Sequence, residues 1–356
     1  MNKDIEILNI EAVENTSNKA KIKNEKRKLK LGKYTKFLLV IDAIAIICFF
    51  LVYGPINYFR EYIVTHSIKS MSHQYFAYVF YNNSIIDKVI EENKVIESGD
   101  STDTSAIKIT EVEDQDTYES IYEEQILKKD EGNDLYKIIT IKESSYTAYI
   151  SVIYDPSRVE VASAKRLSSG GQYTTTIAKA NNAIIAINGG GFSYSGSVMR
   201  PKGVYIEDGK IIYNKAGNRK LIAMTKDNIL LLTNTTAENA LTQGVEDAVE
   251  FGPFLIVNGV AAEFKGDGGY GNRPRTAIGQ RQDGIILFVT VDGKRGLYGT
   301  TLKELTNIFV RYKAYNAANL DGGGSTALVI NGTLKNEPIS WNHGGERPVC
   351  NAWMLK

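Results

Sequence analysis

Four glycine-bearing segments place polar side chains beside predicted strands, and they hold the residues best suited to chemistry. They are Asn188–Phe192 (NGGGF), Gly266–Gly271 (GDGGYG), Arg275–Gly279 (RTAIG) and Asn319–Ser325 (NLDGGGS). Glycine adopts positive φ and lets a ligand approach backbone N–H groups closely. A single segment of this kind is most simply a tight turn. Four of them flanked by Asn, Asp and Arg favour one shared site.

Two carboxylates and one guanidinium in or near these segments have complementary charges. Asp321 precedes three glycines at a predicted strand end, where water and substrate could approach, although a turn Asp that bonds its own backbone would look the same. Asp292 is the second carboxylate candidate, and the Asp292-Gly293 pair is also a hairpin signal. Arg275 could hold a phosphate or pair with an acid at the edge of the core. The sequence leaves these alternatives open.

Several common site signatures are absent from the sequence. No phosphate-binding P-loop and no dinucleotide-binding glycine pattern occurs, so we expect no cofactor. A Ser325/His343/Asp321 triad is compatible with the spacing, but nothing else favours it. Two cysteines and a single histidine after residue 135 exclude a four-cysteine zinc site and a histidine-rich metal site, and no other metal site is defined. A formal net charge of +1 removes the main electrostatic argument for nucleic-acid binding.

Short strands separated by Gly, Asn and Asp dominate residues 135–356, with Asp208-Gly209 as a hairpin turn. Thr301–Tyr312 has the apolar spacing of a helix. We therefore predict an α+β, sheet-rich single domain over 135–356. The predicted strands are Tyr136–Ile141, Thr147–Tyr154, Ala183–Ile187, Gly203–Glu207, Lys210–Tyr213, Leu221–Met224, Ile229–Leu232, Phe254–Asn258, Thr276–Gly279, Ile285–Val291 and Ala327–Ile330.

The N-terminal part of the sequence predicts a membrane anchor. Residues 1–36 end in a basic run, and Phe37–Ile56 is a stretch of 20 mostly apolar residues, long enough as a helix to cross a hydrocarbon core of about 30 Å. No small-residue cleavage site follows it. The positive-inside rule then predicts a cytoplasmic tail over 1–36, a single-pass helix in the lipid bilayer over 37–56, and an extracytoplasmic remainder at the cell membrane. A buried core helix is the alternative.

Residues 57–134 read as a stalk. The part up to residue 96 has apolar and aromatic residues at mixed spacing, much of which reads as helix with breaks near Asn82-Asn83. Residues 97–134 hold 13 Asp and Glu against three Lys. Such a composition is typical of a solvated linker, which we expect to be dispensable for folding.

The order of motifs after residue 146 resembles the phosphodiester glycosidase family, which includes bacterial exopolysaccharide-associated proteins. The resemblance is carried by AINGGGF at 186–192, GVYIEDGKI at 203–211, FGPFLIVNG at 251–259, PRTAIGQRQDGIILFVTVDG at 274–293, NLDGGGSTALVING at 319–332 and RPVCNAWML at 347–355. At Gly191 the family often has an aromatic residue, and here Phe192 stands alone.

This resemblance implies a hydrolase that cleaves the C1–O bond of a sugar-1-phosphodiester, releasing free sugar and a phosphomonoester. It implies a sugar-phosphate or cell-surface glycan substrate. Such a reaction needs a carboxylate near the anomeric carbon and positive charge near the departing phosphate. The residues assigned to these roles are Asp321 and Asp292 as catalytic carboxylates, Arg275 as phosphate clamp, Asn188 for a sugar hydroxyl or a carboxylate, Gly189, Gly190, Gly322 and Gly323 through their N–H groups, and Thr276, Ser325, His343 and Arg347 as further substrate-binding groups.

Two other classes of function remain open from the sequence. A non-catalytic glycan-binding module at the cell surface needs the same glycine loops and polar edges, but no essential carboxylate. A membrane-tethered scaffold would depend on the stalk and would not need the C-terminal domain.

Overall fold

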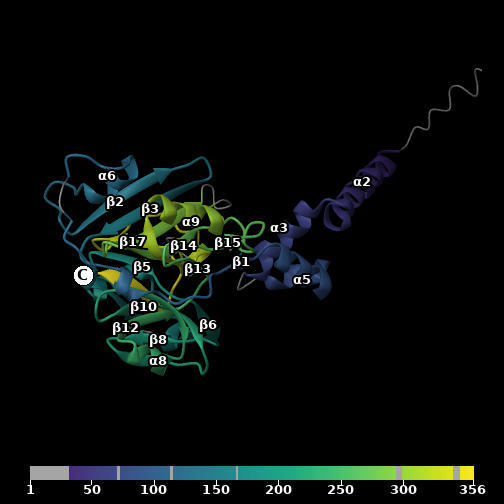
Figure 1. Ribbon diagram of the computed structural model, residues 1–356. Coiled ribbons are helices and arrows are strands. Elements are labelled where there is room, and N and C mark those ends of the chain that lie inside the picture. The colour runs from purple at the N-terminus through teal and green to yellow at the C-terminus, as the bar shows by residue number, and fades with distance from the viewer. Residues whose placement is uncertain (1–31, 70–72, 113–114, 166, 294–298, 340–344) are drawn as a thin grey trace, which may run out of the picture. The chain divides into compact units, whose positions relative to one another are not determined.

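The computed structural model describes residues 32–69, 73–112, 115–165, 167–293, 299–339 and 345–356 (Figure 1). The chain divides at Arg60 into two compact units, Met1–Arg60 and Glu61–Lys356.

The first unit contains helix α2, Lys33–Tyr53, which has no buried residue. Its 21 residues and its mean hydropathy of 2.5 make it long and apolar enough to cross a membrane. A signal sequence near the N-terminus would satisfy the same two criteria.

The second unit is built on three antiparallel sheets and two smaller strand pairs. The seven-stranded sheet runs β14 (Val260–Ala261), β13 (Phe254–Val257), β18 (Ala314–Asn319), β16 (Arg275–Arg281), β17 (Ile286–Gly293), β3 (Tyr146–Ile153) and β2 (Tyr136–Lys142). One five-stranded sheet runs β20 (Thr333–Leu334), β19 (Leu328–Ile330), β5 (Ile185–Asn188), β21 (Asn351–Leu355) and β4 (Val159–Ser163). The other runs β11 (Leu230–Thr235), β10 (Arg219–Thr225), β12 (Val245–Glu250), β8 (Tyr205–Glu207) and β9 (Lys210–Tyr213). The pairs are β6 (Phe192–Ser195) with β7 (Val198–Pro201), and β1 (Val95–Ile96) with β15 (Glu263–Phe264).

Both faces of the seven-stranded sheet are buried, which explains the nearly continuous apolar run of β17. Successive side chains point to opposite faces of a strand. Phe288 of β17 therefore joins a core shared by all three sheets, with Ile222 and Trp353. Its neighbours Leu287 and Val289 face a second core on the other side.

A helix packs on one face of each large sheet. Helix α9, Leu302–Arg311, packs on the seven-stranded sheet, and α7, Thr174–Ala180, packs on the sheet that contains β5. Helix α8, Ala237–Thr242, covers the third sheet. Thr301 and Glu304 form a capping box at the start of α9, which satisfies backbone N–H groups that the helix leaves unpaired.

The described residues from Glu61 up to residue 134 belong to the second unit and pack on its sheets. They include α3 (Asn57–Ile68, of which the first four residues lie in the first unit), α4 (Gln74–Phe80), α5 (Asn83–Glu92), β1 and α6 (Ile121–Leu127). Thr102 exchanges backbone and side-chain hydrogen bonds with β11 at Leu232, and Ile107 and Ile126 are buried. The expectation of a solvated linker over 97–134 is wrong for these residues, because Ile126 joins a core cluster and Thr102 is bonded to β11. A boundary at residue 135 does not separate two compact units.

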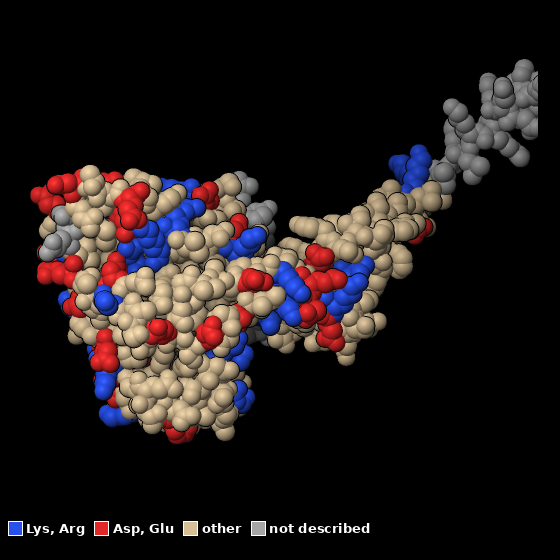
Figure 2. All heavy atoms as spheres, viewed as in Figure 1, with Lys and Arg blue, Asp and Glu red and all other residues tan. Residues whose placement is uncertain are grey.

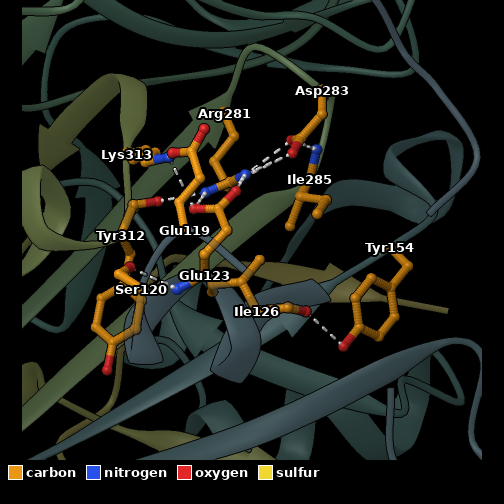
Figure 3. Close-up of polar contacts among 10 residues, drawn as sticks. All are labelled: Glu119, Ser120, Glu123, Ile126, Tyr154, Arg281, Asp283, Ile285, Tyr312 and Lys313. Carbon is orange, nitrogen blue, oxygen red and sulfur yellow. Dashed lines mark hydrogen bonds and ion pairs between the residues drawn. The ribbon is translucent and has the colours of Figure 1, made fainter. Parts of the chain in front are cut away.

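A buried ion cluster fixes α6 to the domain (Figure 3). Arg281 Nη2 lies 2.8 Å from Glu123 Oε1 and 2.7 Å from Asp283 Oδ2, and Arg281 Nη1 donates to the carbonyl of Tyr312 at 2.9 Å. The Tyr154 hydroxyl also donates to the carbonyl of Ile126 at 3.0 Å. The acidic side chain Glu123 is therefore part of the interior.

The observed architecture confirms the α+β, sheet-rich fold class. The predicted helix over Thr301–Tyr312 is α9, and the predicted strand Ile285–Val291 is β17 with small shifts at its ends. Strands β4, β12 and β21 and the β6–β7 hairpin were not predicted. The face shown in Figure 2 carries both basic and acidic side chains.

Candidate active site

Asn188, at the end of β5, ties together three of the segments that the sequence singles out. Its side chain is fully buried. The amide Nδ2 donates to the carbonyl of Asp321 at 2.6 Å. The Oδ1 atom accepts from Thr276 Oγ1 at 2.7 Å and from the Ala327 N–H at 3.1 Å. Asn188 and Thr276 therefore position the loop that carries Asp321, and their predicted contact with substrate stays a prediction.

The glycines after Asn188 allow a close approach to β21. The Gly189 N–H donates to the Asn351 carbonyl at 3.0 Å, and the Gly190 N–H donates to Asn351 Oδ1 at 2.8 Å. A Cβ atom on Gly189 would lie 2.3 Å from Asn351 Oδ1, and one on Gly190 would lie 2.9 Å from Val249. Both N–H groups are thus engaged within the protein, and the role of Gly189 and Gly190 in binding substrate remains a prediction.

Asp321 is a half-buried carboxylate held by the loop that follows β18. Its N–H donates to the Gly189 carbonyl at 3.2 Å, and the Ser325 hydroxyl donates to Oδ2 at 2.6 Å. A Cβ atom on Gly322 would lie 2.8 Å from a backbone oxygen, whereas the Cβ side of Gly323, at φ +61°, faces open space. Gly322 is therefore closely packed, whereas Gly323 has open space on its Cβ side while its N–H donates to the Pro274 carbonyl at 2.8 Å.

Two cations act on Asp321, and both come from parts of the chain outside its loop. Burial raises the pKa of Asp321, while the charges of Arg347 and Lys202 and the hydrogen bond from Ser325 oppose that rise. The Arg347 guanidinium lies 4.6 Å from the centroid of the Phe192 ring, and the Lys202 N–H donates to the Gly191 carbonyl at 2.8 Å. A carboxylate whose pKa burial raises, and on which two cations act, is suited to proton transfer next to an anionic substrate.

Arg275, at the start of β16, is almost fully buried and braces neighbouring loops. Its Nε donates to the carbonyl of Thr300 at 3.0 Å, and its Nη2 donates to the carbonyls of Tyr270 and Gly271. Burial, followed by the nearby charge of Arg273, lowers the pKa of Arg275 to about 9. These contacts give Arg275 a structural task, and its role as phosphate clamp stays a prediction.

Asp292, at the end of β17, has hydrogen bonds to both carboxylate oxygens. Oδ1 accepts from Asn336 Nδ2 and Oδ2 accepts from the Glu337 N–H, both at 2.7 Å. Asn336 in turn binds the Thr326 carbonyl at 3.2 Å. Asp292 therefore supports the loop after β20 and, through Asn336, the chain just beyond Ser325. A catalytic role for Asp292 remains a prediction.

Glu250 is a carboxylate beside the same glycines that the sequence did not single out. The Gly191 N–H donates to its backbone carbonyl at 3.4 Å. Its Oε2 atom is buried without a hydrogen bond from the described residues, and the ion pair with Arg219 Nε is long, at 3.9 Å. Burial raises the pKa of Glu250, opposed by Arg219 and Lys202. The one available signal is its place, directly before the FGPF motif.

The two remaining predictions concern His343 and a metal site. His343, predicted to bind substrate, lies outside the described residues. Among the residues that the structure does describe, no group of three or more His, Cys, Asp or Glu side chains is placed to hold a metal ion.

Comparison with known proteins relates the C-terminal half of the chain to a protein family. The family model described as phosphodiester glycosidase matches residues 181–356. The SPbeta prophage-derived uncharacterized protein YomE of Bacillus subtilis (strain 168) is 28% identical over 187 residues, which cover 49% of this chain and 28% of that protein. The N-acetylglucosamine-1-phosphodiester alpha-N-acetylglucosaminidase of Bos taurus is 41% identical over 64 residues, 18% of this chain and 12% of that enzyme. The matches thus span well under a third of the length of these relatives.

A solved structure shares the fold. The catalytic domain of zebrafish N-acetylglucosamine-1-phosphodiester alpha-N-acetylglucosaminidase, auto-inhibited by its pro-peptide, superposes with a TM-score of 0.54 at 22% identity, covering 64% of this chain and 85% of that one. The range matched by the family model includes Asn188, Asp321 and Asn351. By that match, residues 181–356 form a domain of the phosphodiester glycosidase family.

Proposed function

We propose that this protein hydrolyses the C1–O bond of a sugar-1-phosphodiester, releasing free sugar and a phosphomonoester. The observation that carries the proposal is Asp321, a half-buried carboxylate bonded to Ser325 and flanked by Arg347 and Lys202, inside a phosphodiester glycosidase domain. N-Acetylglucosamine is the first sugar to test, because relatives named for that activity match this chain.

The reaction assigns each group a task. The C1–O bond breaks as the oxygen of water bonds to C1, and one proton of that water passes to the Asp321 carboxylate. The phosphate is already a good leaving group, so it needs little help from a general acid. Arg347 and Lys202 stabilise the negative charge that stays on the departing phosphate. Glu250 is the second carboxylate that we assign to the site, next to Gly191.

The decisive experiment supplies the full chain with the methyl phosphodiester of N-acetylglucosamine 1-phosphate in H₂¹⁸O. We expect ¹⁸O in the released sugar and none in methyl phosphate, because the C1–O bond is the one that breaks. The reverse labelling would mean attack at phosphorus and would contradict the proposal.

Asp321→Asn tests the carboxylate. A group that acts in the transition state affects kcat, so we expect kcat to fall at least about a hundredfold with KM nearly unchanged. The matched control is Asp227→Asn, at an exposed turn position, which should keep wild-type kinetics. If a folded Asp321→Asn protein turns over normally, Asp292 and Glu250 become the carboxylates to test. Binding of the substrate without any turnover by the wild-type protein would favour a glycan-binding module.

We further propose that α2 anchors the protein in the cell membrane with residues 1–36 in the cytoplasm and the glycosidase domain outside, where it would act in cell-surface polysaccharide metabolism. The support is the length and hydropathy of α2 beside a basic N-terminal run. Protease added to intact cells should remove the C-terminal domain and spare the first 36 residues. The opposite pattern would contradict this topology.

A further inference from the structure

Three lysines from separate elements converge next to the candidate active site. Lys69 follows α3, Lys202 lies between β7 and β8, and Lys220 is on β10. Burial lowers the pKa of the Lys69 ammonium, and the positive charges of Lys202 and Lys220 lower it further. Because like charges repel, each of these lysines raises the electrostatic cost of the other two.

Lys69 lines a cavity of about 140 Å³ formed by the N-terminal segment and the glycine-rich loop before β16. Its Nζ lies 5.1 Å from the centroid of the Tyr270 ring. The wall includes Glu97, Pro253, Gly268, Gly269 and Tyr270.

Residues Phe251–Pro253 connect this cavity with the Asn188–Gly191 turn, where the Gly189 carbonyl accepts from the Asp321 N–H. A Cβ atom on Gly191 would lie 3.1 Å from the Phe251 ring and 3.6 Å from Lys202 Cβ. Two residues further along the chain, Pro253 lines the cavity, and a Cβ atom on Gly252 between them would lie 3.6 Å from Lys220 Cδ. The lysines and the Asn188–Gly191 turn are thus connected through Phe251–Pro253.

The acids nearby do not balance the positive charge. Glu97 forms an ion pair with Lys220, and Glu250 pairs with Arg219 at 3.9 Å. Neither Lys69 nor Lys202 forms an ion pair with another side chain in the part of the chain that the structure describes. The positive charges of Lys69 and Lys202 are therefore not neutralised by ion pairs among the described residues. An anion placed between them would relieve their repulsion.

We propose that Lys69, Lys202 and Lys220 bind a second phosphate group, carried by the portion of the substrate that leaves with the first phosphate. The identity of the leaving portion rests on the proposed function, whereas the anion site itself does not. In this proposal Lys69, from the segment 61–134, is a substrate-binding residue.

Binding of inorganic phosphate tests the anion site without any turnover. Isothermal titration calorimetry on the full chain should show phosphate binding that Lys69→Ala weakens about tenfold and Lys69→Arg largely retains. Lys88→Ala is the matched control, because Lys88 is exposed on α5 and pairs with Glu92; it should bind phosphate like the wild type. Absence of binding by the wild type, or equal binding by Lys69→Ala, would overturn the proposal.

Kinetics then test the position of the second phosphate. Two substrates share one sugar 1-phosphate, esterified with methanol or with glycerol phosphate. Lys69→Ala should raise KM about tenfold for the glycerol phosphate diester and less than about twofold for the methyl diester. Equal effects on both substrates, or faster turnover by the variant, would refute this placement and leave the hydrolase intact. If the wild type turns over neither substrate, the proposed function fails and phosphate binding alone decides the anion site.

Discussion

Arg275 has the guanidinium group that a phosphate clamp needs, but its contacts in the structure are with backbone carbonyls. Its guanidinium satisfies three carbonyls of two loops near the site. Replacing it leaves buried carbonyls without partners, which costs about 1 to 3 kcal/mol each.

We therefore expect Arg275→Ala to lower the free energy of unfolding by about 3 kcal/mol or more, measured by urea denaturation. Arg275→Lys should recover only part of this loss, since an ammonium group cannot span the same carbonyls. Wild-type stability in Arg275→Ala would contradict the bracing role. A raised KM in whatever fraction stays folded would support the predicted phosphate clamp, and a normal KM would count against it.

The sequence predicts the residues of the site better than their partners. Asp321, Ser325 and Asn188 stand in glycine-bearing motifs that signal unusual backbone, and the structure brings these three together. Glu250 and Lys202 sit in no such motif. Lys202 meets Gly191 across the β6–β7 hairpin, which was not predicted, whereas Glu250 meets it through a backbone hydrogen bond between distant segments. No local pattern encodes such pairing.

At the level of elements, α6 is the clearest difference between expectation and structure. Its acidic composition predicts exposure, yet the partner of Glu123 is Arg281, 158 residues away. Strands such as β17 were predictable because burial of both faces leaves a continuous apolar run. A short helix that is held by one ion cluster leaves no comparable trace in the sequence.

The ion cluster predicts a pH dependence of stability. Although burial favours the neutral acid, the hydrogen bonds and charges of Arg281 and Lys313 hold the pKa of Glu123 below its ordinary value. Glu123 therefore contributes stability above its unfolded pKa of about 4.3, and that contribution is lost as the pH falls through the lower folded pKa.

Glu123→Gln should thus cost about 2 kcal/mol near pH 7, with the difference from wild type shrinking below about pH 4. Glu131→Gln, at an exposed position before β2, is the control and should track the wild type at every pH. A pH-independent difference for Glu123→Gln would show that lost packing, and not the lost charge, is responsible.

For the whole molecule, the packing of residues 61–134 on the domain changes what a functional unit must include. This segment supplies Ile107 and Ile126 to the interior, pairs β1 with β15 and neutralises Arg281. Removing it would leave a buried arginine with one of its two acid partners, a change that is strongly destabilising.

A chain that begins at Leu135 should therefore melt well below one that begins at Asn57, with an expected loss of about 3 to 5 kcal/mol. Thermal denaturation followed by circular dichroism would measure the difference. Equal melting temperatures would restore the sequence-based expectation that residues 97–134 are dispensable. Adding Glu123→Gln to the longer chain should reproduce part of the loss.

The position of β21 has a consequence for the order in which the protein matures. This strand lies between β5 and β4, and Asn351 at its start binds Gly189 and Gly190. A ribosome makes these residues after every other part of the candidate site. A chain that contains Asp321 but not Asn351 lacks the strand between β5 and β4. A stop codon just before Asn351 should therefore yield a protein with all its proposed catalytic carboxylates and no activity.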